Sequence, residues 1–230
     1  MARVAMAMSG GVDSSVAAAL LKQQGHEVIG LHLKLYHGAE QDSRPKSCCS
    51  LDEAMDARAV CHRLEIPFYV LNVQEEFRSE VIDYFIREYQ DGRTPNPCVM
   101  CNRTIKSRYL LEKADELDCE LLATGHYARS RQDAGSGGWA LARPADLRKD
   151  QTYFLWGVER ESLPRLCFPL ADHVKPRVRR MASELDFAAA DKPDSQEVCF
   201  VPRDYRQFLA AELPETPEPG EFVDTEGKVL

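Results

Sequence analysis

Apolar and polar positions alternate with two different periods in the first 125 residues, and these periods predict strands alternating with helices. Apolar runs typical of buried strands lie at residues 2–8, 26–35, 68–73 and 120–124. Helical spacing of apolar residues lies between and after them, over residues 13–24, 51–64, 75–90 and 105–117. This order favours an α/β fold of the Rossmann-like kind, in which helices cover both faces of a parallel sheet.

Turn-forming residues separate these segments. Gly25 suits the end of the first helix, and Ile66-Pro67 and Asp91-Gly92 suit the ends of the next two. Two prolines predict a loop over residues 93–101, and the stretch 132–138 predicts a flexible loop. Residues 150–210 predict short helical segments mixed with turns.

The last residues differ in composition from the rest of the chain. A proline-rich stretch is followed by Glu-Phe-Val and Lys-Val-Leu on either side of Asp224-Thr-Glu-Gly227, which predicts the start of a hairpin. We therefore expect one large domain over residues 1–200. Residues 201–230 are expected to begin a central β-rich domain that the sequence does not complete.

Composition and charge narrow the class of protein. The chain has 230 residues, 44% of them hydrophobic, which is typical of a soluble globular protein. Its net charge of −8 argues against a protein that coats nucleic acid without specificity. Three basic clusters predict either a local RNA footprint or ordinary solvated faces: residues 103–108, residues 143–149 and residues 175–180.

The sequence contains no signal peptide or membrane-length apolar run, so we expect a cytoplasmic protein without a membrane partner. We expect this protein to be a monomer or a weak dimer. Cytoplasmic thiols stay reduced, so eight cysteines indicate chemistry or metal binding before structural disulfides. Cys61, Cys119 and Cys167 lie in apolar contexts and are expected in the core. The adjacent Cys48 and Cys49 suit either a structural role or a secondary sulfur site.

The segment from Ser9 to Ser15, Ser-Gly-Gly-Val-Asp-Ser-Ser, is the strongest chemical signal, and we call it the phosphate loop. Its two glycines allow a tight turn between the first strand and the first helix. Amides at the start of that helix, together with serine hydroxyls, can bind phosphate. The loop has no lysine, which argues against transfer of a γ-phosphate. The alternative is a glycine turn capped by Asp13 and the serines.

Four further motifs occur in order along the chain. They are Thr94-Pro95-Asn96-Pro97 with Cys101-Asn102, residues 123–129, residues 149–155, and residues 194–200. In these motifs and in the phosphate loop, the chain resembles the PP-loop ATP pyrophosphatases and, among them, the tRNA-specific 2-thiouridylase family. The resemblance covers essentially the whole chain, and members of that family continue into a central domain and a C-terminal β-barrel.

The resemblance implies a role for particular residues. ATP, with Mg²⁺, would be bound by Ala7, Met8, Ser9, Gly10, Gly11, Val12, Asp13, Ser14, Leu33 and Gly125. The target base would be bordered by Asn96, Pro97 and Cys98, and tRNA would be contacted by Lys149, Asp150 and Gln151. Cys199 would carry sulfur as a persulfide, and Cys101 would be the second catalytic thiol.

These residue roles agree with the chemistry of a uridine C2 carbonyl. Its carbon is a poor electrophile, and its oxygen is a poor leaving group. Adenylation by ATP converts the C2 oxygen into AMP, which leaves readily. Sulfur must then attack as a thiolate or persulfide, delivered by a sulfur-donor protein or as hydrosulfide. A second cysteine can resolve the intermediate as a disulfide.

Cys98 departs from one form of the family pattern, in which an aspartate follows Asn-Pro. It creates a Cys98-x-x-Cys101 pair, and Cys199 supplies a third thiolate, one short of a closed zinc site. Three thiolates suit a [4Fe-4S] cluster with one open iron, and a plain dithiol competes with that hypothesis. In both cases we expect the three cysteines to converge on one pocket that faces the phosphate loop.

Alternative functions remain open on the sequence alone. Another PP-loop enzyme could thiolate RNA at a different position, and an iron–sulfur or zinc module could bind RNA without catalysis. Amidating PP-loop enzymes need no paired cysteines, so Cys101 and Cys199 argue against them. His126 lies at a strand end and is expected near the ATP site, whereas His32 alternates within a strand and is expected to be structural.

Overall fold

The computed structural model describes residues 1–35, 51–194, 198–201, 204–213 and 220–230. The chain divides into two compact units, Met1–Phe200 and Val201–Leu230, which are described separately. No helix in these described ranges is long and apolar enough to cross a membrane.

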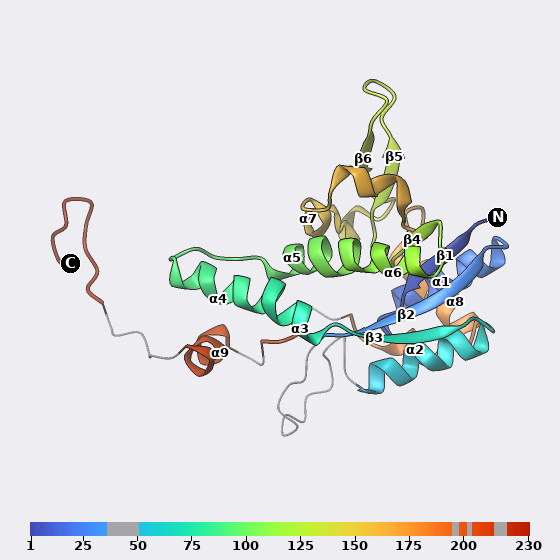
Figure 1. Ribbon diagram of the computed structural model, residues 1–230, viewed down its shortest axis with the longest axis horizontal. Coiled ribbons are helices and arrows are strands. Elements are labelled where there is room, and N and C mark those ends of the chain that lie inside the picture. Colours follow the sequence, from blue (N-terminus) through green and yellow to red (C-terminus); the bar gives the residue numbers. More distant parts are fainter. Residues whose placement is uncertain (36–50, 195–197, 202–203, 214–219) are drawn as a thin grey trace. The chain divides into compact units, whose positions relative to one another are not determined.

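A five-stranded parallel sheet forms the centre of the first unit (Figure 1). Its order is β3-β2-β1-β4-β7, with β1 at Arg3–Ala7, β2 at Glu27–Lys34, β3 at Phe68–Asn72, β4 at Leu121–Ala123 and β7 at Leu166–Cys167. The four strands predicted from the sequence are confirmed, and β7 was not foreseen because two residues carry no detectable period. The strand order reverses at β1, which has β2 on one side and β4 on the other. Ligands of open α/β sheets bind at such a reversal, beyond the carboxyl ends of the strands.

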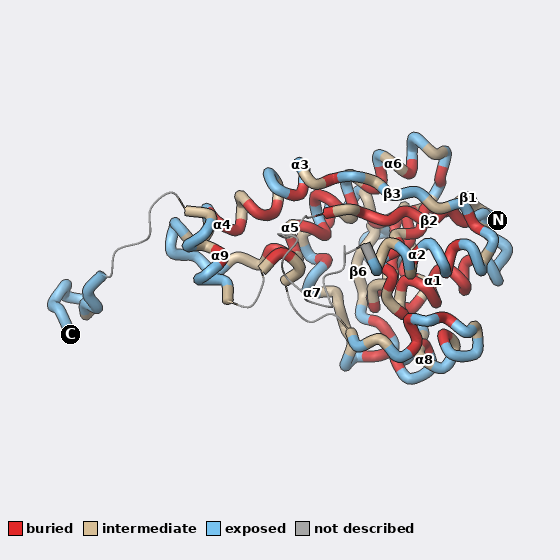
Figure 2. Tube along the Cα trace, turned by 90° about the horizontal axis from the view of Figure 1, so that it is seen from below, coloured by how far each residue is buried: buried red, intermediate tan, exposed pale blue. Residues whose placement is uncertain are grey.

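Helices cover both faces of this sheet (Figure 2). On one face lie α1 (Val12–Gln23), α2 (Leu51–Arg63) and α8 (Lys175–Glu184), and on the other lies α6 (Leu110–Glu116), which contacts β1 and β4. The predicted Rossmann-like α/β fold is therefore confirmed. Val16, Ala17 and Ala18 of α1 are fully buried, and these small side chains let the helix approach the sheet closely.

The helix predicted over residues 75–90 is present as α3 (Gln74–Phe77), a π-helical turn η1 (Arg78–Ile82) and α4 (Asp83–Gln90). The predicted loop over residues 93–101 is wrong in its second half, because α5 runs from Pro97 to Arg103. The side-chain oxygen of Asn96 accepts hydrogen bonds from the amides of Cys98 (3.1 Å) and Val99 (3.3 Å), and proline is favoured at the first helical position. Helical backbone then continues through η2 (Thr104–Tyr109) into α6. Cys98 and Cys101 consequently lie on a helix.

An antiparallel hairpin of β5 (Arg129–Gln132) and β6 (Trp139–Ala142) follows β4 and was not predicted. The expected loop over residues 132–138 includes its turn. After the hairpin come η3 (Leu147–Lys149), α7 (Thr152–Leu155), η4 (Arg160–Arg165) and η5 (Ala188–Asp191). This region agrees with the predicted mixture of short helices and turns.

The second unit contains α9 (Tyr205–Glu212) and an antiparallel bridge between Val223 and Val229. The Asp224 amide donates to the Lys228 carbonyl at 2.9 Å, so the predicted hairpin start around residues 224–227 is present. Its assignment to a central β-rich domain stays a prediction.

Candidate functional site

The phosphate loop joins β1 to α1 at the point where the strand order reverses. Gly10 has a φ of +78°, and a Cβ at this position would lie 2.4 Å from the Glu53 carbonyl oxygen, so only glycine fits. Gly11 is the N-cap of α1, and no side chain caps the helix there. Asp13 makes no cap bond, and the serine hydroxyls bond the turn that precedes the helix. The first amides of α1 keep their capacity to bind an anion.

The serines of the phosphate loop fix its backbone. The hydroxyls of Ser14 and Ser15 donate to the Gly11 carbonyl at 3.0 and 2.9 Å. The hydroxyls of Ser9 and Ser14 lie 3.1 Å apart, and the Gly11 amide donates to the Ser9 hydroxyl at 3.3 Å. These contacts hold the loop in one conformation before any ligand binds, which lowers the entropic cost of binding.

Three other predicted ATP residues lie at the carboxyl ends of neighbouring strands. Ala7 ends β1, Leu33 is near the end of β2, and Gly125 follows β4. A Cβ on Gly125 would lie 2.8 Å from the Ser14 amide nitrogen, so this glycine lets the end of β4 approach the phosphate loop. The structure brings these residues to the same edge of the sheet as the loop.

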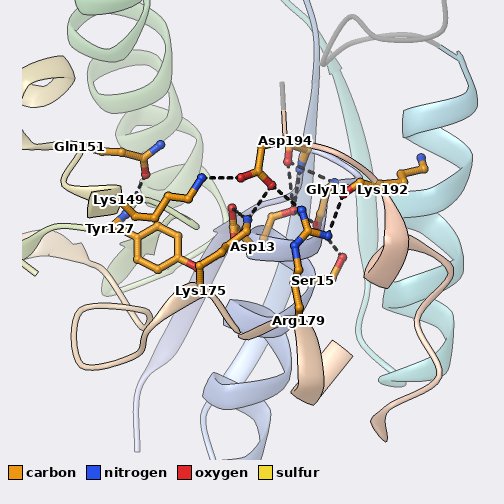
Figure 3. A network of polar contacts seen from close by, with 12 residues as sticks. Gly11, Asp13, Ser15, Tyr127, Lys149, Gln151, Lys175, Arg179, Lys192 and Asp194 are labelled. Carbon is orange, nitrogen blue, oxygen red and sulfur yellow. Dashed lines mark hydrogen bonds and ion pairs between the residues drawn. The ribbon is translucent and has the colours of Figure 1, made fainter. Parts of the chain in front are cut away.

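Asp13 turns away from the helix cap toward a lysine and a tyrosine (Figure 3). The Lys175 ammonium lies 2.8 and 2.7 Å from the two Asp13 carboxylate oxygens, and the Tyr127 hydroxyl donates to Asp13 at 2.9 Å. Burial and the neighbouring Asp13 carboxylate raise the pKa of Tyr127 far above its usual range. Tyr127 therefore stays a neutral hydrogen-bond donor to Asp13.

Asp194 joins the same network from a distant part of the chain. It accepts from the ammonium groups of Lys149 and Lys175, each at 2.8 Å, and from the Arg179 guanidinium at 2.9 Å. Partial burial disfavours the carboxylate, but the bonds from Lys149 and Lys175 outweigh it and lower the pKa of Asp194 to about 2. Three cationic side chains thus meet the carboxylates of Asp13 and Asp194. One positive charge is in excess beside the phosphate loop.

Lys175, Arg179 and Tyr127 were not predicted as members of the site. The sequence placed Lys175 and Arg179 in a basic cluster expected to be either a local RNA footprint or a solvated face. Instead, Lys175 is only 7% exposed and both side chains point into the network (Figure 3). Their i, i+4 spacing puts them on one face of α8, which is the one sequence signal that could have indicated a shared partner.

The segment predicted to contact tRNA also supports the local backbone. It consists of Lys149, Asp150 and Gln151. Asp150 accepts from the Thr152 hydroxyl and from Arg143, both at 2.7 Å. The Gln151 side chain accepts from the Tyr127 amide at 2.8 Å, and the Gln151 amide donates to the Tyr127 carbonyl at 3.0 Å. These bonds tie the segment to Tyr127 and so to Asp13. The predicted tRNA contact itself stays a prediction.

The predicted catalytic cysteines lie on segments that share a packing partner. Cys101 is buried on α5, and Cys98 lies one turn before it. Cys199 is half-buried and precedes Phe200, whose ring packs at 5.8 Å from Phe77 and 5.3 Å from Phe85. Those two aromatic residues belong to α3 and α4, and η1 between them packs against α5. Convergence of the three cysteines on a single pocket stays a prediction.

The expected iron–sulfur ligand set is not assembled. In the part of the chain that the structure describes, no group of three or more His, Cys, Asp or Glu side chains could hold a metal ion. The hypothesis that Cys98, Cys101 and Cys199 ligate a [4Fe-4S] cluster therefore does not fit this arrangement. Among the described cysteines no disulfide is formed, including between Cys101 and Cys199. Cys48, Cys49 and the residues 195–197 lie outside the described residues.

Magnesium makes a different demand on the protein, because it is usually bound by one or two carboxylates together with substrate phosphates and water. Asp13 at the phosphate loop is a carboxylate of this kind, but both of its oxygens contact the Lys175 ammonium here. To hold Mg²⁺ beside the nucleotide, Asp13 would exchange the contact of at least one oxygen for the metal.

The cysteines expected in the core behave as structural residues. Cys61 and Cys119 are buried, and burial raises the pKa of Cys61 to about 12. A Cβ on Gly30 of β2 would lie 2.6 Å from the Cys61 sulfur, so this glycine makes room for the thiol. Cys167 is only half-buried on β7, although burial of its sulfur also raises its pKa.

The two histidines singled out in the sequence are both held by local bonds. His32 is buried, with Nδ1 2.9 Å from the Met8 carbonyl oxygen, as expected of a structural residue. His126 is half-buried, with Nδ1 2.8 Å from the Thr124 hydroxyl. Loss of solvent around the ring and the nearby Lys106 charge both disfavour the protonated form and lower the pKa of His126 to about 3. The ring is therefore neutral near pH 7. It adds no positive charge to a phosphate site.

Comparisons with known proteins agree with this geometry. The family described as tRNA methyl transferase HUP domain matches residues 2–203. A protein of Symbiobacterium thermophilum named tRNA-specific 2-thiouridylase MnmA is 50% identical and is aligned over 99% of this chain and 60% of its own length. A Chloroflexus aurantiacus protein of the same name is 51% identical over 100% of this chain and 64% of its own length. The chain thus spans less than two thirds of these relatives.

A solved structure shows the same fold at low sequence identity. The crystal structure of a 4-thiouridine synthetase–RNA complex with bound ATP superposes with a TM-score of 0.56 at 17% identity. The superposition covers 93% of this chain and 50% of that chain. At this identity the likeness supports the fold alone.

Proposed function

Because the chain belongs to the tRNA methyl transferase HUP domain family, we propose that it is the ATP-dependent catalytic part of a tRNA 2-thiouridylase. The relatives that match nearly all of its length carry that name. The observation that carries the proposal is the phosphate loop, with Lys175 bound to its Asp13, at the reversal of strand order. We assign residues 1–200 to this catalytic domain and residues 201–230 to the start of the central domain.

ATP binds with its pyrophosphate against the phosphate loop. The amides that begin α1 donate to phosphate oxygens, and the Ser9 and Ser14 hydroxyls hold the loop that presents these amides. The surplus positive charge around Lys175 adds electrostatic attraction. The backbone and apolar side chains of the remaining predicted residues surround the nucleoside: Ala7, Met8, Val12, Leu33 and Gly125. Mg²⁺, held by Asp13 and phosphate oxygens, would neutralise charge on the leaving pyrophosphate.

The first chemical step is adenylation of the target base. The C2 oxygen of a wobble uridine attacks the α-phosphorus of ATP, and the bond to the β-phosphate breaks, so pyrophosphate leaves. Asn96, Pro97 and Cys98 at the start of α5 border the base, and Lys149, Asp150 and Gln151 contact the tRNA. The base must be taken out of its stack to reach such a site.

Sulfur transfer follows with two thiols. The terminal sulfur of a Cys199 persulfide attacks C2, and AMP leaves with the former C2 oxygen. The Cys101 thiolate then attacks the Cys199 sulfur, which releases 2-thiouridine and forms a Cys101–Cys199 disulfide. Two routes restore the Cys199 persulfide. Hydrosulfide can attack the Cys199 sulfur of the disulfide, which forms the persulfide and releases the Cys101 thiol. Alternatively, a thiol reductant reduces the disulfide, and a donor protein then transfers the outer sulfur of its own persulfide to Cys199. Because the described residues assemble no metal site, no step is assigned to an iron–sulfur cluster.

The test is product analysis with the complete protein, ATP, tRNA and a sulfide or persulfide source. We expect AMP and pyrophosphate in equal amounts, and 2-thiouridine in the nucleoside digest by mass spectrometry. ADP as the nucleotide product would contradict the proposal. A thiolated nucleoside other than 2-thiouridine would favour the second candidate, thiolation of RNA at another position. tRNA binding without ATP turnover would indicate a non-catalytic RNA-binding module.

A further inference from the structure

Two large aromatic side chains are exposed directly after the segment that carries the proposed tRNA contacts. Tyr153 is 64% exposed and Trp156 is 69% exposed, and both belong to or follow the short helix α7. Leu155 between them is buried and anchors the helix. Burial of aromatic surface of this size strongly favours association, so side chains left in water beside a proposed site indicate a partner.

Specific contacts fix α7 to the helix that carries Cys98 and Cys101. The side-chain amide of Asn102 donates to the Phe154 carbonyl at 3.0 Å, and Asn102 is buried. A Cβ on Gly157 would lie 3.1 Å from the Val99 side chain, so this glycine allows the chain to pass closely over α5. Figure 1 shows α7 next to α5. The aromatic side chains therefore stand on a rigid support next to the proposed catalytic helix.

The charges around these aromatic residues favour a polyanion. Arg148 has a side chain that is 87% exposed, and Arg103 is exposed on α5 beside Gly157. The two carboxylates of the preceding segment are already engaged. Asp146 accepts from the amides of Lys175 and Arg148, and Asp150 accepts from Thr152 and Arg143.

We propose that Tyr153 and Trp156 form a stacking surface for unpaired RNA nucleotides that flank the modified base. This inference rests on the proposed function and identifies the part of the substrate that α7 contacts. Single-stranded nucleic acids are bound by aromatic rings that stack on bases, combined with basic groups that attract the backbone. Removing a uridine from its stack leaves its neighbours without stacking partners, and the exposed rings replace them. A protein partner would favour a contact centre depleted of charge, unlike this arginine-flanked surface.

Intrinsic fluorescence tests the contact directly, since the sequence has two tryptophans, Trp139 and Trp156. In the complete protein, the emission difference between the W139F variant and the W139F/W156F variant isolates Trp156. We expect a hairpin RNA with the target uridine unpaired in its loop to quench this emission. A blunt RNA duplex of the same composition is expected to leave it unchanged. The absence of quenching by the hairpin, at concentrations that saturate binding, would overturn the proposal.

Binding measurements with matched variants provide the second arm. We expect Tyr153→Leu and Trp156→Leu each to weaken hairpin RNA binding about tenfold, and Trp156→Phe to restore most of the affinity. Tyr69→Leu is the control, because Tyr69 is 49% exposed on β3 and lies outside α7. Binding of ATP in the absence of RNA, measured by calorimetric titration, is expected to be the same in all of these proteins.

The outcomes separate this inference from the proposed function. If the wild type thiolates tRNA but the leucine variants bind RNA normally, the stacking surface is wrong and the function stands. If the wild type fails to thiolate but Trp156 is quenched by the hairpin, the function is wrong and the surface stands. Shielding of Trp156 from acrylamide in the RNA-free protein would show that another segment or a second copy covers it, which also overturns the proposal.

Discussion

The Lys175 ammonium nitrogen lies 2.7 Å from an Asp13 carboxylate oxygen, although 162 residues separate the two in sequence. This ion pair connects the phosphate loop to α8. Because Lys175 also contacts Asp194, five residues before Cys199, one side chain links the proposed ATP site to the segment that carries the proposed sulfur donor. The amide of Lys175 donates to Asp146 at 3.0 Å, which further fixes its position.

We expect Lys175→Met to reduce AMP formation at least tenfold. The substitution removes the surplus positive charge beside the phosphate loop and leaves two carboxylates close to the expected position of the pyrophosphate. Steady-state release of pyrophosphate measures the effect. Arg177→Met is the control, since it removes a positive charge from an exposed position on the same helix.

Folding must be followed in the same experiment, because removal of one partner of a buried ion pair costs about 3–5 kcal/mol. Circular dichroism and thermal unfolding report on this loss. If Lys175→Met is folded and turns over ATP at the wild-type rate, the proposed pyrophosphate site is in the wrong place.

The low pKa of Asp194 predicts an acid-dependent loss of stability. A carboxyl group whose pKa is lowered to about 2 in the folded state, below its unfolded value near 4, stabilises the protein above pH 4. This contribution is lost as the pH falls from about 4 to about 2. We expect Asp194→Asn to lower the melting temperature at pH 6 and to flatten its dependence on pH over that interval.

Differential scanning calorimetry from pH 2 to pH 6 measures this effect. Asp191→Asn is the matched control, because Asp191 is an exposed carboxylate in the same stretch of chain. Other carboxylates with lowered pKa values contribute to the wild-type profile, so the difference between the two variants is the relevant quantity. Equal profiles for both variants would show that the Lys149, Lys175 and Arg179 contacts do not stabilise the fold.

The parts of the fold that the sequence predicted are those specified by local signals. The first three strands, the helices between them and the phosphate loop follow from apolar period and glycine placement. Asn96-Pro97 was interpreted as part of a loop because prolines usually end regular structure. Asparagine before proline is equally a helix-start signal, and the cap bonds of Asn96 show which one applies here.

The Lys175 network could not be predicted, because it depends on contacts distant in sequence. Nothing near Lys175 indicates that Asp13 and Asp194 will both approach its ammonium group. Strand β7 was missed for a related reason, since its two residues join the sheet by pairing with β4 and have too little local pattern. A single sequence contains the residue types of the site but not the pairing that tertiary structure imposes on them.

Asn96 has two proposed roles, capping of α5 and contact with the target base, and substitutions can separate them. We expect Asn96→Ala to lower the free energy of unfolding by about 1 kcal/mol, because the Cys98 and Val99 amides lose their acceptor. Asn96→Ser is expected to retain most of the stability, since serine is also a good N-cap. Urea unfolding measures both variants.

Thiolation by the same two variants shows whether the amide also touches the target base. If Asn96→Ser unfolds like the wild type but thiolates tRNA poorly, the side-chain amide contacts the substrate. If its activity is unchanged, Asn96 acts only by placing α5.

Cys98 distinguishes dithiol chemistry from a cluster. In the proposed two-thiol mechanism only Cys101 and Cys199 exchange sulfur, so we expect Cys98→Ala to keep substantial thiolation activity, whereas Cys101→Ala and Cys199→Ala abolish it. One round of adenylation, followed as pyrophosphate release, should persist in all three variants, because none of these thiols belongs to the phosphate loop. 2-Thiouridine is quantified by mass spectrometry of digested tRNA.

The same proteins must also be prepared without oxygen, and their iron and acid-labile sulfide must be measured after reconstitution. A wild type that binds about four irons per chain, together with a Cys98→Ala variant that loses both iron and thiolation, would restore the cluster hypothesis. Without bound iron, loss of activity only in the Cys101 and Cys199 variants identifies the transferring and resolving thiols, and the half-buried Cys98 then contributes no sulfur chemistry at the start of α5.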